Sequence, residues 1–158
     1  MLYSKIMVPY DGSEHAKHAL EYAKGLAAAS DAKIAIVHVV PSGVMGVDQL
    51  GTEGSLDGVP FGMLNYEQYE GVVRAALDQA KEKVTEHLQG LIEDIPGEVT
   101  IEVVAGTAPA EALARYAEKN GCDLIVMGRR GLGAIRGMLG SVSFGLLRST
   151  DVPVLTVK

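Results

Sequence analysis

The feature of this sequence that most constrains its fold is a strict alternation of short apolar runs with segments of helical periodicity. The runs have the apolar, β-branched content of strands that are covered on both faces. They are Lys5–Pro9, Lys33–Val40, Glu98–Val104, Asp123–Met127 and Val152–Val157. Strands that alternate with helices pair in parallel, and the helices pack on both faces of the sheet. We therefore predict an α/β fold with a single open parallel sheet of five strands, of the Rossmann-like kind.

Local signals place helices between these strands. Ser13 is suited to cap a helix, because its hydroxyl can accept a hydrogen bond from an N–H of the first turn. Pro109 stands where a later helix would begin, a position at which its missing N–H costs nothing. Between the two, an apolar stripe runs from Val73 to Ile95, and we expect it to be core packing rather than a partner surface.

The segment from about residue 41 to residue 69 fits neither pattern, since it is rich in glycine, poor in charge and without sustained periodicity. A loop of this length is unusual in a compact domain and is typical of a lid, a binding loop or local disorder. The chain of 158 residues has the size of one domain. We expect a single domain over residues 1–158 with this long glycine-rich loop at about residues 41–69, and we expect the loop to be mobile without ligand and partly ordered when a ligand binds.

Composition excludes several classes of function. The net charge of −6 argues against nonspecific binding to nucleic acid or to an anionic membrane. Cys122 is the single cysteine, so an internal disulfide framework is excluded, and a small buried thiol is expected there. No signal peptide is visible, and no apolar run approaches the length of a membrane span. We expect a cytoplasmic protein that binds neither nucleic acid nor membrane.

A glycine-rich stretch after the fourth strand carries most of the functional information. Residues 127–143 read MGRRGLGAIRGMLGSVS, between an apolar run and a predicted helix. The N-terminus of a helix presents unpaired N–H groups and a favourable dipole to an anion, and glycines let the backbone approach it. No lysine follows these glycines as in a P-loop, and the stretch comes too late in the chain for a dinucleotide fingerprint. A phosphate-bearing ligand is predicted, and a merely flexible loop is the alternative.

Other strand ends extend this prediction. In parallel sheets of this kind, ligands bind beyond the carboxyl ends of the strands, where the strand order reverses. The first strand is followed by Asp11, which could accept hydrogen bonds from a ribose or a base amine, or else form the turn beside Gly12. Apolar residues at the ends of the second and fourth strands could enclose a flat purine. The ligand class narrows to a nucleotide.

Five stretches together carry a resemblance to a known family: Ile6–Glu14, Val37–Val40, Asp123–Gly131, Gly140–Ser143 and Val152–Val154. They resemble the first two strands, the nucleotide loop and the final strand of the universal stress protein family, and the resemblance extends over nearly the whole chain. It implies the strand order 3-2-1-4-5. It also implies the family's ATP-binding branch, whose loop has Gly, two residues, Gly, nine residues and then Gly-Ser or Gly-Thr.

The resemblance implies a set of ligand-binding residues. Those around the adenosine would be Pro9, Tyr10, Asp11, Val39, Met127 and Gly128; those holding the phosphates would be Gly131, Gly140, Ser141, Val142 and Ser143. Backbone N–H groups and the two serine hydroxyls would donate to the phosphates, and a side chain at Gly140 would occupy the anion's space. Mg²⁺ or Mn²⁺ would be held mainly by the phosphates. The sequence departs from the pattern in having eight residues, not nine, between Gly131 and Gly140.

Several polar residues have two interpretations. Arg129 and Arg130 either steer phosphates or are solvated, and Arg136 either meets a terminal phosphate or is a solvated loop arginine. His38, within an apolar strand, is interpreted as a core histidine rather than a ligand. No Ser/His/Asp or Cys/His set stands at a common strand end, so the sequence assigns no catalytic residue and no metal-ligating side chain.

The resulting prediction is an ATP-binding stress-response or regulatory protein. A slow ATPase or phosphotransfer enzyme is one alternative, and an interaction module that has lost nucleotide is another. We also expect a homodimer formed through the final strand, Val152–Val157, because its apolar edge lacks the charges that discourage strand pairing. Members of the family that the chain resembles commonly dimerise in this way.

Overall fold

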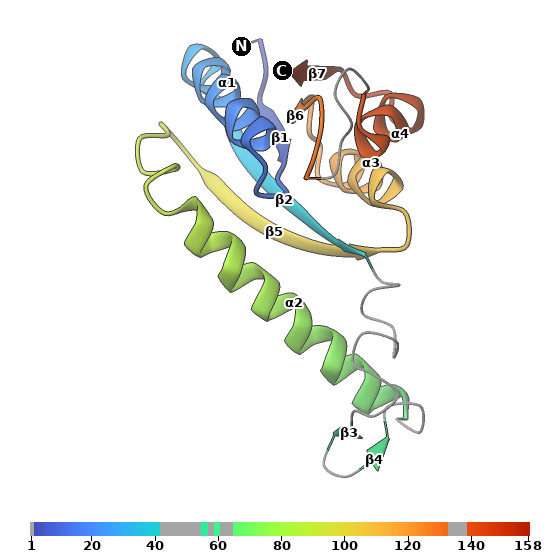
Figure 1. Cartoon of the computed structure of the whole chain (residues 1–158). Helices are drawn as coiled ribbons and strands as arrows, with labels where there is room; N and C mark the ends of the chain where they lie inside the picture. Colours follow the sequence, from blue (N-terminus) through green and yellow to red (C-terminus); the bar gives the residue numbers. More distant parts are fainter. Residues whose placement is uncertain (1, 42–54, 57–58, 61–64, 133–138) are drawn as a thin grey trace.

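Five parallel strands form the central sheet of the computed structural model, in the order β5-β2-β1-β6-β7 (Figure 1). Their bounds are β1 (Lys5–Pro9), β2 (Lys33–Pro41), β5 (Val99–Gly106), β6 (Leu124–Gly128) and β7 (Val154–Val157). Counted along the chain within this sheet, the order is 3-2-1-4-5, so the predicted fold class and strand order are confirmed. The structure describes residues 2–41, 55–56, 59–60, 65–132 and 139–158.

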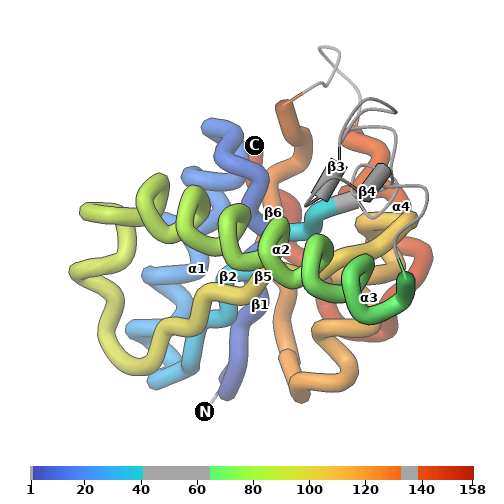
Figure 2. The backbone as a smooth tube through the Cα atoms, turned by 90° about the horizontal axis from the view of Figure 1, so that it is seen from below, coloured from blue at the N-terminus to red at the C-terminus, as the bar shows by residue number. Residues whose placement is uncertain are grey.

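Within the described residues, four helices cover the two faces of the sheet. They are α1 (Glu14–Ser30), α2 (Tyr66–Leu88), α3 (Pro109–Lys119) and α4 (Ser141–Ser149). Residues of α1 and α2 share one buried apolar cluster, and residues of α3 and α4 share the other. Figure 2 shows α1 and the α3–α4 pair on opposite sides of the strands. The strand residues alternate between these two clusters, as expected of strands buried on both faces.

The start of α1 follows from its capping residue. Ser13 has extended backbone angles, and its hydroxyl accepts a hydrogen bond from the N–H of Ala16 at 3.1 Å. The helix then buries one alanine-rich face and ends at Asp31, whose φ of 55° closes it in the left-handed conformation. The small alanine side chains let α1 lie close to the sheet, and the predicted cap at Ser13 is confirmed.

Helix α2 differs from the expectation. It begins at Tyr66 with a capping box between Asn65 and Gln68, and it ends at Leu88 rather than continuing to Ile95. Only Val84 and Leu88 of the helix are buried, so the apolar stripe is core packing at its C-terminal end alone. Figure 1 shows the N-terminal end of α2 diverging from the sheet, which explains why the earlier part of the stripe is less covered.

The expected long loop is described only in part. Strand β2 extends to Pro41, and two short strands, β3 (Ser55–Leu56) and β4 (Val59–Pro60), pair in antiparallel fashion within the segment. The start of α2 at Tyr66 also shortens the irregular stretch at its C-terminal end. The remainder, residues 42–54, 57–58 and 61–64, lies outside the described residues. The prediction that this segment becomes partly ordered with ligand concerns these residues and lies outside the described part of the chain as well. None of the helices in the described segments has the length and hydropathy needed to cross a membrane.

The topology defines one place for a ligand. Strand β1 pairs with β2 on one side and with β6 on the other, so the order of the strands reverses between β1 and β6. The chain leaves the carboxyl end of β1 toward α1, on one face of the sheet. It leaves the carboxyl end of β6 toward α4, on the other face, through residues 129–140, here called the glycine-rich loop. Such divergence opens a crevice at the edge of the sheet.

Candidate functional site

The turn after β1 forms the first wall of the site. Tyr10 N–H donates to the carbonyl of Val37 at 2.9 Å, which continues the pairing of β1 with β2 beyond Pro9. Oδ1 of Asp11 then accepts a hydrogen bond from Ser13 N–H at 3.0 Å, so this carboxylate closes a local turn just before the cap of α1. Asp11 therefore forms the turn, as one interpretation predicted. It could also bind a ribose or a base amine, as the other interpretation predicted, because its Oδ2 is not used within the turn.

The second wall begins where β6 ends, at the buried Gly128. A Cβ atom added there would lie 2.8 Å from the backbone carbon and from Cβ of His15, in the first turn of α1. No side chain fits between the two segments, because contacts this short do not occur in folded proteins. The glycine therefore allows α1 to cross the end of β6 closely, and it brings Asp11 and the glycine-rich loop to the same edge.

The backbone of Arg129 joins the two ends of the glycine-rich loop and ties the loop to β7. Its N–H donates to the carbonyl of Val157 in β7 at 2.6 Å, and its carbonyl accepts from Gly140 N–H at 3.0 Å. A Cβ atom at Gly140 would lie 3.3 Å from Cα of Arg130 and 3.5 Å from the carbonyl oxygen of Arg129. Bulk at Gly140 would therefore press on the loop backbone, in addition to the expected effect on the space of the anion.

The N-terminus of α4 faces the same edge of the sheet. Gly140 is its N-cap and supplies no side chain, so the N–H groups of Ser141, Val142 and Ser143 have no partner within the helix or from its cap. The hydroxyl of Ser143 is buried and donates to the carbonyl of Gly128 at 3.0 Å, which ties α4 to the end of β6. The single proton of the hydroxyl is used in this bond, whereas donation to a phosphate was expected. The backbone N–H of Ser143 has no partner within the helix and could donate to a phosphate instead.

A cavity of about 530 Å³ lies between these walls. Every residue that the family resemblance implied lines it: Pro9, Tyr10, Asp11, Val39, Met127, Gly128, Gly131, Gly140, Ser141, Val142 and Ser143. These residues come from β1, β2, β6, the glycine-rich loop and α4, so segments far apart in the sequence meet at one place. The volume lies within the range of small-molecule sites, about 300–1,000 Å³.

Eight further residues line the cavity and were not assigned from the sequence: Ala16, Val37, His38, Pro109, Leu113, Arg130, Leu132 and Leu139. Val37 could have been found from strand alternation, because it lies on the same face of β2 as Val39. His38 was interpreted as a core residue, but it is half-buried and borders the cavity. Arg130 lines the cavity whereas Arg129 does not, and Arg136 lies outside the described residues.

Three polar side-chain atoms are buried without a hydrogen-bond partner among the described residues: the hydroxyl of Tyr10, Nε of Arg130 and Nδ1 of His15. Tyr10 and Arg130 line the cavity. Burial raises the pKa of the Tyr10 phenol, so Tyr10 stays neutral at physiological pH. The buried Nε–H of Arg130 is a donor that an acceptor on a ligand could satisfy. Buried polar groups without partners are costly, and they often mark places where a ligand or water completes the structure.

Protein side chains offer little to a metal ion in this structure. Within the described parts of the chain, no three His, Cys, Asp or Glu side chains gather in a way that could hold one. A cation at this site would therefore depend on oxygen atoms of the ligand for most of its coordination, as Mg²⁺ does on substrate phosphates.

Comparison with known proteins places the chain in a family. The model of the universal stress protein family matches residues 2–158. A universal stress protein of Thermus aquaticus is 35% identical over 161 residues, covering 99% of this chain and 100% of its own length. Universal stress protein MJ0577 of Methanocaldococcus jannaschii is 28% identical over 159 residues, covering 100% of this chain and 96% of its own length.

Solved structures agree with these matches. The structure of MJ0577 has a TM-score of 0.73 at 26% identity, covering 100% of this chain and 97% of the other. The structure of a universal stress protein in complex with cAMP has a TM-score of 0.61 at 27% identity, covering 100% of this chain and 99% of the other. Both likenesses extend over the whole chain.

Proposed function

The chain belongs to the universal stress protein family, and on that premise we propose that it binds ATP and acts as a stress-response or regulatory protein of the ATP-binding branch. One observation carries the proposal. All of the residues implied by the nucleotide-binding pattern line a single cavity at the point where the strand order reverses, next to the uncapped N-terminus of α4.

The cavity offers two chemically different halves. The half near β1, β2 and β6 is lined by apolar residues such as Pro9, Val39 and Met127, with the Asp11 carboxylate beside them, which suits a purine and its ribose. The half near α4 presents the N–H groups of its first turn and Arg130, which suits phosphates. We place adenosine in the first half and phosphates in the second, with Mg²⁺ or Mn²⁺ on the phosphate oxygens.

We propose binding rather than catalysis because three polar side chains that border the cavity are already used to hold the structure. Oδ1 of Asp11 closes a turn, Nδ1 of His38 bonds the carbonyl of Tyr10, and the Ser143 hydroxyl bonds Gly128. Efficient phosphoryl transfer needs a group that positions the attacking water or hydroxyl. Among the described residues we identify none with that placement, so ATP hydrolysis would be slow at most.

A second candidate ligand is an adenosine monophosphate, cyclic or open. The relative solved with cAMP supports it, as does the loop that is one residue shorter than the family's ATP pattern. A shortened loop affects the outer phosphates more than the adenosine, because the adenosine contacts come mainly from the strand ends. The two candidates therefore differ in whether the β- and γ-phosphates add affinity.

Calorimetric titration tests the proposal. We expect wild-type protein to bind ATP with magnesium in the micromolar range, and Asp11→Asn to bind at least about tenfold more weakly, because a hydrogen bond to a charged group is lost. Asn can still accept the bond from Ser13 N–H, so the turn is preserved. Asp78→Asn, which neutralises an exposed carboxylate on α2, should bind as wild type does.

Titrations with cAMP and AMP in parallel separate the two ligands. ATP binding tighter than AMP binding supports contacts from the outer phosphates, and cAMP or AMP binding as tightly as ATP supports the second candidate. Absence of binding for all three would contradict both, and equal binding by wild type and Asp11→Asn would contradict the assignment of Asp11.

A further inference from the structure

We propose that His38 is a positioning residue of this site: its side chain fixes the backbone of Tyr10 and thereby the direction of the Asp11 carboxylate. The inference rests on the proposed function, since it assigns to His38 a role in ligand affinity that acts through Asp11. It concerns a residue whose interpretation from the sequence was core packing.

Strand alternation places His38 on the face of β2 opposite to Val37 and Val39, although the residue also borders the cavity. Ile36 packs in the cluster with α1 and α2, and Val37 and Val39 pack with α3 and α4. His38 therefore falls on the α1–α2 face of β2, while its neighbours on either side face the cavity. A histidine on this face near the end of a strand can support the turn after β1 from the side opposite the apolar wall.

One short contact shows what it supports. Nδ1 of His38 lies 2.7 Å from the carbonyl oxygen of Tyr10. A carbonyl can only accept, so Nδ1 carries the proton and donates it, which fixes the tautomer of the neutral ring with Nε2 unprotonated. The N–H of Tyr10 meanwhile donates to Val37 at 2.9 Å. Both backbone groups of Tyr10 are thus held by consecutive residues of β2.

This bond lies where regular strand pairing stops. The ladder between β1 and β2 ends at the pair Pro9 and Val37, one residue before Tyr10. The His38 side chain continues the attachment beyond that point, and the next residue in the chain is Asp11. Without the His38 side chain, the carbonyl of the peptide group between Tyr10 and Asp11 would lose its hydrogen-bond donor. The peptide group could then rotate more freely.

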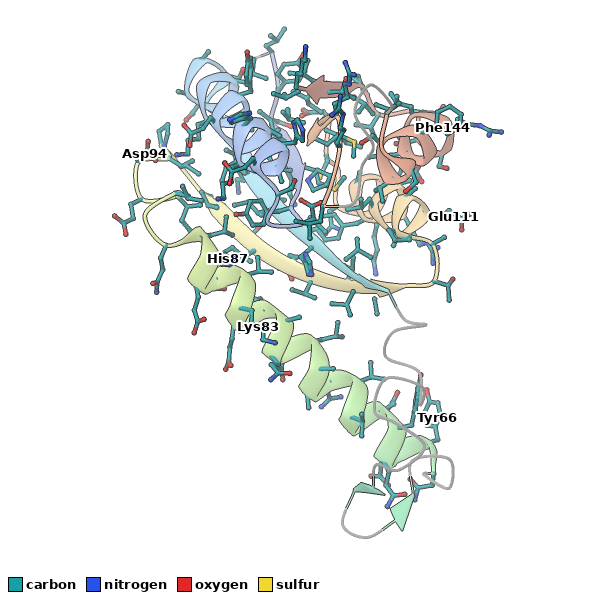
Figure 3. The ribbon with its side chains drawn as sticks, viewed as in Figure 1. Tyr66, Lys83, His87, Asp94, Glu111 and Phe144 are labelled. Carbon is teal, nitrogen blue, oxygen red and sulfur yellow. The ribbon has the colours of Figure 1, made fainter. Side chains whose placement is uncertain are left out.

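The surroundings of the turn also bear on the direction of the Asp11 carboxylate. Gly12 has a φ of 81°, and a Cβ atom there would lie 3.4 Å from Nδ1 of His87, which Figure 3 labels on α2, so α2 borders the turn. A Cβ atom on Gly131 would lie 2.5 Å from Oδ2 of Asp11, so that oxygen faces the glycine-rich loop. With Oδ1 bound to Ser13, the direction of Oδ2 follows from the backbone that His38 holds.

A carboxylate held in its binding orientation before the ligand arrives loses less conformational entropy on binding. His38 therefore raises affinity through the orientation of Asp11, although it also borders the cavity itself. The effect of removing the Nδ1 donor is expected to be that of one net hydrogen bond, a loss of about three- to tenfold in affinity. The loss should depend on Asp11, because Asp11 is the group that is positioned.

Two variants of His38 separate the hydrogen bond from simple packing. His38→Leu keeps comparable bulk and removes the donor, and His38→Asn keeps an N–H near the position of Nδ1. In titrations with ATP and magnesium, we expect His38→Leu to bind about three- to tenfold more weakly and His38→Asn to stay within about twofold of wild type. In the Asp11→Asn background, His38→Leu should cause no further loss. Leu and Asn variants that bind alike, or a loss that persists undiminished without the Asp11 carboxylate, would overturn the inference.

A measurement without ligand keeps the two proposals distinguishable. Hydrogen exchange of the Ser13 amide, which donates to Asp11, reports how firmly the turn is held. We expect faster exchange in His38→Leu than in wild type and His38→Asn. Equal exchange in all three proteins would overturn the inference even if ATP binds, and faster exchange would support it even if wild type binds no ATP and the proposed function fails.

Discussion

At the scale of single residues, glycines of this chain differ sharply in what surrounds them. A methyl group added at Gly131 would meet Oδ2 of Asp11 at 2.5 Å, whereas one added at Gly25 in α1 would meet nothing within 4 Å. The first position is adapted to the site, and the second lies in an ordinary helix interior where alanine is the better residue. The two positions form a matched pair for the same substitution.

Gly131→Ala is expected to weaken ATP binding by about tenfold, because the Asp11 carboxylate must move away from its position. Its effect on stability should be small, since the crowded atom is the end of a side chain that can rotate. Gly25→Ala should raise the free energy of unfolding by about 0.5–1 kcal/mol and leave binding unchanged. Denaturant unfolding and calorimetric titration of both variants check these outcomes. A Gly131→Ala protein that binds normally would show that the position of Asp11 is unimportant.

Residues of the site could be predicted from the sequence where a backbone pattern marks them. The glycines, Asp11 and the residues at strand ends are identified by spacing and by their place after apolar runs, and the structure gathers them at one cavity. His38 and Arg130 could not be singled out in this way. Their contributions depend on a contact across strands and on which of two adjacent arginines faces inward, and neither is encoded in local periodicity.

At the scale of elements, the residue before β6 fastens the beginning of β1. The Asp123 carboxylate accepts hydrogen bonds from Ser4 N–H at 2.7 Å, from the Ser4 hydroxyl at 2.6 Å and from Lys5 N–H at 3.1 Å. Partial burial opposes its ionisation, but these bonds outweigh that effect and lower the pKa of Asp123. The carboxylate therefore stabilises the central strand pair in its charged form.

Asp123→Asn is expected to lower the free energy of unfolding by about 1 kcal/mol at pH 7, since Asn retains only part of the acceptor capacity. Because the pKa of Asp123 is lower in the folded protein, its contribution is complete above the unfolded pKa of about 3.9 and is lost as the pH falls through the folded value. The difference between wild type and variant should thus narrow below about pH 4. Denaturant unfolding across this range measures it, with the exposed Asp151→Asn as control. A difference that stays constant with pH would contradict this account.

The elements of the sheet could be predicted from the sequence because each strand is a short apolar run, which is buried on both faces in the central strands β1, β2 and β6. Helix α2 was predicted less well: its apolar stripe continues past Leu88 into residues such as Ile95, which are buried after the helix has ended. Periodicity records burial and not helical hydrogen bonding, so it cannot place that boundary. The two-residue strands β3 and β4 are too short to leave a pattern.

At the scale of the whole molecule, we propose a homodimer through β7, which lies at one end of the strand order. The carbonyls of Pro153 and Val157 bond to the β6 side, so alternation directs the backbone groups of Val154 and Thr156 outward. The apolar side chain of Leu155 is 39% exposed. No strand of the described segments pairs with the outer edge of β7. Such an edge favours pairing with a second copy.

Thr156→Pro removes an outward N–H and should shift the protein from dimer to monomer in sedimentation while leaving the pairing with β6 intact. Thr156→Val keeps the N–H and the strand propensity, and should remain dimeric. Leu155 is the poorer site for proline, since its N–H points toward β6 by the same alternation. Wild-type protein that sediments as a monomer at high concentration would rule out the dimer, and a dimeric Thr156→Pro protein would place the interface elsewhere.

The central claim is that an adenine nucleotide binds in the cavity between the β1 turn and the N-terminus of α4. The most direct measurement is titration of ¹⁵N-labelled protein with ATP and magnesium, followed through the backbone amide signals. The account predicts that the signals of Asp11, Gly131 and Ser141–Ser143 shift and saturate together, while that of Gly25 in α1 does not change. Unchanged signals at the first turn of α4, or shifts confined to another face such as the groove between β5 and α3, would contradict it.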